Sequence, residues 1–370
     1  MSPQLSVVHV YGTQYQMGQA YGQLLKTEIN TLVPEVYDYI YAQIGAVLKN
    51  LPPEVQKAVE ELGADAALDL WVDFTKDFVP PHYTDFISGM ANGTGLAAKD
   101  ILKISLFPEI IKMSCSMFGA WGPATAGVDL GLVQLRALDW STDGPFQKFP
   151  VLLVYHPAAG DGHAFASLTW AGLVGSITGM SAANMGVSEK VWLNYDGPYS
   201  PVGTPTTFVL QDILQYDVDT DQALSRIAST NRTASIFVGI GDKYNNEFKA
   251  VEYSHTTVNV FNDRNFPVYQ YHDRFDSLVF VDKHTQPSAH PCLNELLHQY
   301  YGKLSPENTI KYITSQFQTG DMHVAVYDFE RGFMFVSNAS PVSANGTVVK
   351  AYDRPFVRVN MTAAFALSHP

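Results

Sequence analysis

Hydrophobic positions in the first 114 residues recur at the three-to-four-residue spacing of amphipathic helices. Met17, Tyr21 and Leu25 begin this pattern, with Gly18 and Gly22 on a neighbouring face. Pro-Pro and Asn-Gly pairs separate the later stretches. The spacing predicts helices over residues 17–32, 36–48, 53–79, 83–93 and 96–112. We therefore expect the N-terminal part of the chain to be mostly helical.

From Cys115 onward the pattern changes to short apolar or alternating stretches, which are typical of strands. Helices are predicted over 206–215, from Asp219 onward, over 292–301 and over 306–317, where Ser305 is a suitable N-cap and Pro306 a suitable first residue. Strands are predicted over residues 115–121, 131–140, 151–155, 164–169, 186–192, 235–240, 250–253, 257–260, 322–328 and 333–337. The last two strands are expected to close the fold.

Strands and helices come in groups rather than in strict alternation, which favours a layered α+β fold over a sheet built from βαβ units. The chain has 370 residues, of which 46% are hydrophobic and 12% aromatic, enough for a sizeable core. We divide it into a helical segment, residues 1–114, and a strand-rich segment, residues 115–370.

The net charge of the chain limits the kinds of partner that it can bind. Only 16% of the residues are charged and the net charge is −13, so phosphate backbones repel the chain and nucleic acid is not an expected partner. No apolar run is long enough for a transmembrane helix, and the first residues lack the basic and apolar regions of a secretory signal. His9, His82, His156 and His163 lack metal-ligand spacing, so we expect no zinc site.

Asn-x-Ser/Thr sequons point to the secretory route in spite of the missing signal. They exceed what chance would give, and they favour a lysosomal or secreted glycoprotein over a cytosolic protein with accidental sequons. The expected glycosylation sites are Asn92, Asn231, Asn338, Asn345 and Asn360.

Three polar residues stand out where helical and strand-rich segments meet. Cys115 lies at the junction, and Arg136 and Asp139 interrupt an otherwise apolar strand, three residues apart and so on opposite sides of the pleat or at a strand end. A buried guanidinium and carboxylate are costly unless they are paired or used. The residues alone fit either a core cysteine with an internal ion pair or a reactive site. The second cysteine, Cys292, is expected to be a small core residue on a helix.

The ordered set of Cys115 followed by Arg136-Ala137-Leu138-Asp139-Trp140 resembles the N-terminal-nucleophile (Ntn) cysteine hydrolases. This group includes bile salt hydrolase, penicillin acyltransferase, acid ceramidase and N-acylethanolamine acid amidase. Residues 178–190 resemble the strand of the last two enzymes that ends in Asn-Glu-Arg, with Glu189 on the family glutamate. Further matches are residues 17–22, 278–284 and 292–295. The chain is most similar to acid-ceramidase-like proteins of lower eukaryotes.

The resemblance implies a four-layer αββα sandwich and an inactive precursor that cuts itself. The Cys115 thiol would attack the Ser114–Cys115 bond and free the α-amino group of Cys115. That group, with a pKa near 8, can then serve as the base. Arg136 would stabilise the thiolate, Asp139 would orient the amine, and Glu189 would fix either of them. No cofactor is implied.

The family pattern is not complete in this chain. A Thr-Asn pair of the family is replaced by Lys283-His284, so His284 or Gln286, with a backbone N–H, is expected to hold the oxyanion. A family arginine downstream has no counterpart before Cys292.

The sequence as a whole favours an amidohydrolase acting on lipid-like acyl amides such as ceramides or N-acylethanolamines. Its expected partners are the small-molecule substrate, a lipid-presenting activator or membrane surface, and the two fragments of the same chain. The alternatives are an acyltransferase or a phospholipase-B-like enzyme of the same fold, and a non-catalytic binding protein on that fold.

Overall fold

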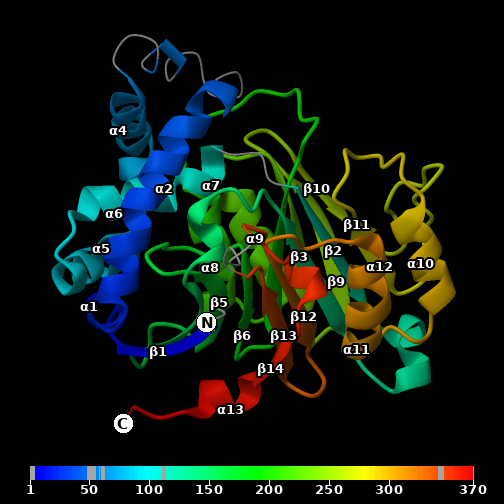
Figure 1. Cartoon of the computed structure of the whole chain (residues 1–370). Helices are drawn as coiled ribbons and strands as arrows, with labels where there is room; N and C mark the ends of the chain where they lie inside the picture. Colours follow the sequence, from blue (N-terminus) through cyan, green and yellow to red (C-terminus); the bar gives the residue numbers. More distant parts are fainter. Residues whose placement is uncertain are drawn as a thin grey trace.

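Two β-sheets lie face to face between layers of helices in the computed structural model of the chain (Figure 1). The structure describes residues 5–47, 56–57, 59, 63–110, 114–340 and 346–369. In Figure 1 the N-terminal helices cover one side of the molecule and α10 to α12 cover the other, with the strands between them. The α+β class and the four-layer αββα order expected from the sequence are confirmed.

The larger sheet has eight strands. Its first pair, β1 with β4, is parallel, and every later pair is antiparallel. In order across the sheet, the strands are β1 (Ser6–Gly12), β4 (Pro150–Pro157), β5 (Phe165–Trp170), β6 (Thr178–Ser181), β7 (Met185–Val191), β8 (Ile236–Asp242), β9 (Glu247–Tyr253) and β10 (Val258–Phe261).

The smaller sheet has six strands, all paired antiparallel. In order, they are β11 (Leu278–Val281), β2 (Ser114–Ala120), β3 (Val133–Asp139), β12 (His323–Asp328), β13 (Phe333–Asn338) and β14 (Val357–Asn360). The strands β2 and β3, which carry Cys115, Arg136 and Asp139, are therefore central neighbours in this sheet.

The helices form two outer layers and a short C-terminal element. The N-terminal helices are α1 (Gln14–Leu24), α2 (Lys26–Val47), α4 (Ala64–Thr75), α5 (Pro81–Thr94), α6 (Ala98–Ser105) and α7 (Phe107–Ile110). They are followed by α8 (Thr206–Tyr216), α9 (Thr220–Ser229), α10 (Cys292–Tyr300), α11 (Pro306–Asn308), a π-helical turn (Thr309–Thr314), α12 (Ser315–Phe317) and α13 (Met361–Ala366).

Three hydrophobic clusters correspond to the three spaces between the layers. One joins the outer face of the large sheet to α1, α2, α5 and α8, through residues such as Tyr21 and Phe208. A second lies between the sheets and brings together Met117 of β2 and Phe237 of β8. The third joins the small sheet to α10 and the π-helical turn. Burial of three apolar interfaces is what holds the layers in this order.

The expected N-terminal pattern needs three corrections. Residues 6–12 form a strand, because their backbone pairs with that of β4 in the large sheet. Pro34 lies inside one long helix, α2, and the break in the chain comes earlier, at Leu25. Helix α5 also begins two residues earlier than predicted, with Pro81 in its first turn, where a missing N–H costs nothing. Parts of the helices predicted over 36–48, 53–79 and 96–112 lie outside the described residues.

The C-terminal pattern is largely as predicted, but β6 and β11 were not among the predicted strands, and two further corrections are needed. The Ser305 side chain accepts a hydrogen bond from Asn308 N, which confirms the N-cap, but the helix predicted over 306–317 contains a π-helical turn. The strand that ends at Asn338 does not close the fold, because β14 pairs with β13 and α13 follows it. The mixed polar sequence of β14, which is largely exposed, gave no clear strand signal.

Helices α1 and α5 pack backbone to backbone through glycines. A Cβ atom at Gly18 would lie 2.0 Å from Phe86 O, and one at Gly89 would lie 2.0 Å from Tyr15 O. Gly22 and Gly93 are similarly close to backbone atoms of the partner helix. The glycines that interrupt the helical pattern of residues 17–32 are therefore required by the close approach of these helices.

We predict that Gly89→Ala lowers the free energy of unfolding by about 1–3 kcal/mol in urea denaturation, because the new methyl group forces the two helices apart. Alanine has the higher helix propensity, so local effects act in the opposite direction. Ser88→Ala, at an exposed neighbouring position of α5, is the control and is expected to change stability by less than about 0.5 kcal/mol. An unchanged or increased stability of Gly89→Ala contradicts this close packing of α1 and α5.

Candidate active site

The pairing of β2 with β3 decides which side chains share a face. Cys115 lies opposite Leu138, Met117 opposite Arg136, and Ser114 opposite Asp139. Directly opposed residues of an antiparallel pair point to the same side of the sheet. Because Met117 packs between the two sheets, Cys115 and Arg136 face that space as well. Asp139 and Ser114 face the other side, toward α12.

The Arg136 guanidinium joins the groups on the inner face. Its Nη2 lies 3.4 Å from Cys115 Sγ and 3.4 Å from Glu189 Oε2, and its Nη1 donates to His323 Nε2 at 3.0 Å. Arg136 and Cys115 have no exposed surface and Glu189 almost none. Three residues far apart in the sequence, Cys115, Arg136 and Glu189, are thus brought into one buried cluster.

His323 completes this cluster and was not found from the sequence. Its Nε2 also lies 3.0 Å from Thr178 Oγ1, and its ring lies 5.5 Å from that of Trp170. Burial and the neighbouring Arg136 hold the pKa of His323 well below its usual value. The ring is therefore neutral and its Nε2 accepts from Arg136, which has no acceptor of its own. The available signal was a histidine at the start of strand 323–328, whose next four residues are apolar or aromatic.

Burial controls the charge state of the candidate nucleophile. It raises the pKa of the Cys115 thiol to about 12, against the opposing effect of the Arg136 charge. Burial likewise raises the pKa of Glu189, and Arg136 again opposes the shift. At physiological pH the sulfur is therefore a neutral thiol, with a guanidinium in contact to stabilise a thiolate once the proton leaves.

Asp139 is held on the opposite face of β3 by several polar groups. Thr319 Oγ1 donates to its Oδ2 at 2.6 Å, and Gly320 N donates to its Oδ1 at 2.9 Å. Lys283 Nζ lies 3.8 Å from Oδ1. Burial raises the pKa of Asp139 to about 6, and Lys283 is the largest of the opposing influences. Asp139 thus lies next to Ser114 at the start of β2.

A buried lysine adds to the positive charge around the site. Lys190, next to Glu189 on β7, is fully buried, donates to Val191 O at 3.1 Å and lies 5.8 Å from the Phe237 ring centroid. Burial lowers its pKa, and a negative charge on Cys115 would be the strongest influence in the opposite direction. Ser188-Glu189-Lys190 stands where the resemblance has Asn-Glu-Arg, and this basic position was not selected from the sequence.

His284 makes its described contacts away from Cys115. Its Nδ1 lies 3.4 Å from Asp282 Oδ2, and its ring stacks on that of His290 at 4.7 Å. Gln286 Nε2 donates to Asp282 Oδ1 at 2.7 Å. Both side chains that were expected to hold the oxyanion thus contact Asp282.

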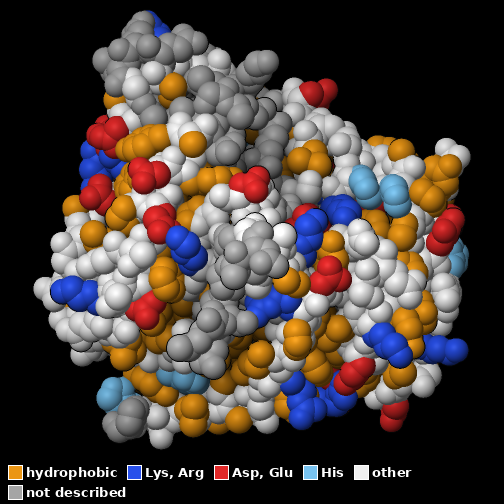
Figure 2. Space-filling model, viewed as in Figure 1, with side chains coloured by type: hydrophobic (Ala, Val, Ile, Leu, Met, Phe, Trp, Pro, Cys, Tyr) orange, Lys and Arg blue, Asp and Glu red, His pale blue; other side chains and the backbone are white. Residues whose placement is uncertain are grey.

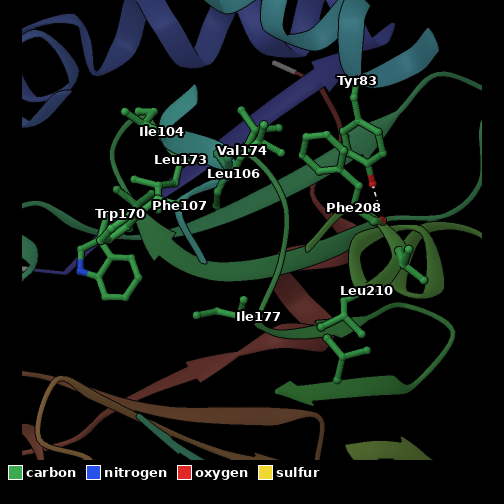
Figure 3. Close-up of a cluster of buried hydrophobic side chains, with 14 of the residues drawn as sticks. Tyr83, Ile104, Leu106, Phe107, Trp170, Leu173, Val174, Ile177, Phe208 and Leu210 are labelled. Atoms are coloured by element: carbon green, nitrogen blue, oxygen red, sulfur yellow. Dashed lines mark hydrogen bonds between the residues drawn. The ribbon is translucent and has the colours of Figure 1, made fainter. Parts of the chain in front are cut away.

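An apolar pocket lies beside the buried cluster. Trp170, whose ring faces His323, is one of its walls, and Trp140 directly follows Asp139. Figure 3 shows Phe107 of α7 gathered with Trp170, Leu173, Val174 and Ile177. The pocket is lined by Phe107, Pro108, Trp140, Phe146, Thr169, Trp170, Leu173, Val174, Gly175, Ile177 and Thr207. The N-terminal segment therefore contributes to its wall.

Glu109 fastens this part of the N-terminal segment to the strand-rich segment. Its Oε1 accepts a hydrogen bond from Thr206 N at 2.6 Å, at the start of α8, and its Oε2 accepts one from the Thr233 hydroxyl. A carboxylate is favoured at a helix N-terminus, where backbone N–H groups lack partners. This attachment lies five residues before Ser114 in the chain.

The five sequons differ in their surroundings. Asn92, Asn231 and Asn360 are exposed or partly exposed, and Asn360 caps α13. Asn338 is buried within β13, so a glycan on it has no room in the folded chain. Asn345 lies outside the described residues.

The described ranges contain neither a metal-binding cluster nor a membrane-spanning helix. No group of three or more His, Cys, Asp or Glu residues within them is arranged to hold a metal ion. No helix in the same ranges has both the length and the apolar character needed to cross a bilayer. On the face shown in Figure 2, acidic and basic side chains are interspersed rather than gathered by sign.

Comparison with known proteins gives the family. Protein dcd1A of Dictyostelium discoideum is 40% identical over 382 residues, which cover 98% of this chain and 86% of that protein. The chain belongs to the dcd1 family. Protein dcd1B of the same organism is 38% identical over 386 residues, covering 100% of this chain and 76% of that protein. No protein-family model matches the chain.

Comparison with solved structures gives a match of low similarity to this chain. It is the N-acylethanolamine-hydrolyzing acid amidase ortholog of Caenorhabditis elegans, with 14% identity and a TM-score of 0.44, covering 66% of this chain and 100% of that one. Similarity at this level does not transfer an activity, so the chemistry of the dcd1 chain rests on its own residues.

We predict that Cys115 of the uncut chain resists iodoacetamide at pH 8, while Cys292, which is partly exposed, is modified. The thiolate is the reactive form, and both burial and a pKa of about 12 keep it rare at Cys115. Peptide mass spectrometry before and after unfolding in urea measures the two sites. Equal labelling of both cysteines in the folded chain contradicts the buried position of Cys115.

Proposed function

We propose that the chain is an Ntn cysteine amidohydrolase that cuts itself between Ser114 and Cys115 and then hydrolyses acyl amides. The contact that carries the proposal is Arg136 Nη2 at 3.4 Å from the buried Cys115 Sγ, with Glu189 on the same guanidinium. A structural cysteine has no need of a buried arginine, whose desolvation is costly. A nucleophilic cysteine gains from it, since a cation stabilises the thiolate.

Self-cleavage would begin with attack of the Cys115 sulfur on the carbonyl carbon of Ser114. The peptide C–N bond breaks as the thioester forms, and the thiol proton passes to the departing nitrogen. Water then hydrolyses the thioester. The products are a carboxyl group on Ser114, a free thiol and the α-amino group of Cys115.

Substrate hydrolysis would use the new amine as the base. It takes the thiol proton, the sulfur attacks the amide carbonyl, and the same proton reaches the leaving amine as the acyl thioester forms. Water, deprotonated by the amine, then releases the carboxylic acid and restores the thiol. Asp139 would orient the amine, while Arg136 and the buried Lys190 keep positive charge around the sulfur.

Lipid-like acyl amides, of the ceramide or N-acylethanolamine type, are the substrate class we propose. The support is the apolar lining of a small pocket beside the cluster, with Trp140, Phe146 and Trp170 among its walls. An aliphatic acyl chain gains free energy by leaving water for such a surface. A lipid-presenting activator or a membrane surface would deliver such a substrate, which is sparingly soluble.

A lysosomal or secreted location belongs to the same proposal. Its support is the set of sequons at positions that are not buried, Asn92, Asn231 and Asn360. Glycosidase treatment of protein from its natural source tests this, and a band of unchanged mobility argues against the secretory route.

We predict that purified chain separates into residues 1–114 and 115–370 on a denaturing gel, and that Cys115→Ala leaves it intact. Hydrolysis should fall by at least about a thousandfold, because the nucleophile is lost. Cys292→Ala is the matched control and should keep both activities. Sequencing the N-terminus of the larger fragment identifies the bond. If Cys115→Ala hydrolyses acyl amides as fast as the parent chain, the proposal is wrong. If the parent chain stays intact and hydrolyses nothing, the chain is a binding protein.

A substrate panel separates the enzymatic alternatives. Ceramide and N-acylethanolamine are expected to be cleaved faster than a phospholipid or an acyl-amino acid. Preferred cleavage of the phospholipid indicates a phospholipase-B-like enzyme. Transfer of the acyl group to an added amine in preference to water indicates an acyltransferase.

A further inference from the structure

The two strands that neighbour β2 in the small sheet, β11 and β3, both end toward its first residues. The ladder between β11 and β2 ends at the pair Val281 and Met117. Lys283 comes two residues after Val281, in the bend that follows β11. On the other side, Asp139 of β3 lies opposite Ser114. Asp139 is thus a direct neighbour of Ser114, and Lys283 comes from the chain that follows the other neighbouring strand of β2.

The side chains of these two residues meet across the start of β2. Lys283 Nζ lies 3.8 Å from Asp139 Oδ1 and donates to Gln318 O at 2.7 Å. It also lies 5.0 Å from the Phe317 ring centroid. The Lys283 side chain is about a quarter exposed, whereas that of Asp139 is buried. A cation and a carboxylate are therefore held together on the α12 side of the bond that the proposed function cuts.

We propose that Lys283 is a positioning residue, whose ammonium holds Asp139 ionised at the start of β2 and keeps the freed amine of Cys115 unprotonated. This inference rests on the proposed function and adds a residue to it. Lys283 stands in the Lys283-His284 pair that replaces the Thr-Asn pair of the resembling enzymes. The replacement thus brings a positive charge to the site at the position where this chain differs from the family pattern.

The charges around Asp139 decide whether the pKa of its carboxyl rises or falls. Burial raises the pKa of Asp139 to about 6, Lys283 lowers it, and Asp321 raises it. Asp321 is itself paired with Lys350 at 3.1 Å. Cys115 on β2 and Lys190 on β7 also interact with Asp139 electrostatically. Thr319 and Gly320 N fix the orientation of the carboxylate without adding charge.

Removal of the Lys283 charge should raise the pKa of two groups, the Asp139 carboxyl and the Cys115 amine. The pKa of Asp139 rises, because a nearby cation no longer favours the carboxylate. The pKa of the Cys115 amine rises as well, because a like charge no longer opposes its protonation. The pH below which the base is protonated and the enzyme inactive therefore moves upward.

The test measures kcat/KM against pH for the self-cleaved enzyme with ceramide or N-acylethanolamine, whichever is cleaved faster. Lys283→Met should move the acid limb upward by about one pH unit or more, and Lys283→Arg should restore it. Lys311→Met, at a lysine of the neighbouring π-helical turn, removes the same net charge and should leave the limb unchanged. Thermal unfolding confirms that each variant is folded, and Lys283→Gln replaces Lys283→Met if the latter is not.

A second readout does not depend on activity. The carboxyl of Asp139 is titrated by ¹³C NMR in the uncut Cys115→Ala chain and assigned by comparison with Asp139→Asn. Adding Lys283→Met should raise the midpoint. If the acid limb and this midpoint both stay in place while Cys115→Ala still abolishes hydrolysis, Lys283 has no positioning role and the proposed function stands. If the parent chain hydrolyses nothing, the proposed function fails, and an unmoved midpoint then overturns the Lys283–Asp139 coupling as well.

Discussion

Burial of the Arg136 guanidinium is the constraint on which the site depends. A charge without solvent must find partners inside the protein, and here they come from three strands: Cys115 on β2, Glu189 on β7 and His323 on β12. Because β7 belongs to the large sheet and the others to the small sheet, the guanidinium links the two sheets. The same contacts place a cation against the Cys115 thiol and keep water away from it.

The pleat of β3 gives the site two separate environments. Arg136 faces the space between the sheets, where it acts on the sulfur, and Asp139 faces α12, where Thr319 and Gly320 hold it. A spacing of three residues on one strand produces this division. Under the proposed mechanism the Cys115 residue bridges the two environments, with its sulfur on one side and its backbone nitrogen near the other.

The N-terminal segment is part of the same folded unit rather than an appendage. Strand β1 pairs with β4, Glu109 binds the start of α8 and a residue of the chain before β8, and Phe107 lines the apolar pocket. A cut after Ser114 would therefore leave two fragments held by a shared sheet and core. It would also leave the pocket wall attached to the larger fragment only through non-covalent contacts.

The sequence by itself determined the layered α+β class, most strands and helices, and the polar residues Cys115, Arg136 and Asp139, whereas Glu189 was selected through the resemblance to the Ntn hydrolases. These are signals of local periodicity and of charge within apolar strands, which one stretch of chain can carry. The tertiary structure decided that β1 joins the large sheet, that His323 contacts Arg136, that Asp282 engages His284, and that Lys283 meets Asp139. Those facts depend on strand register and on contacts between distant residues, which no local pattern specifies.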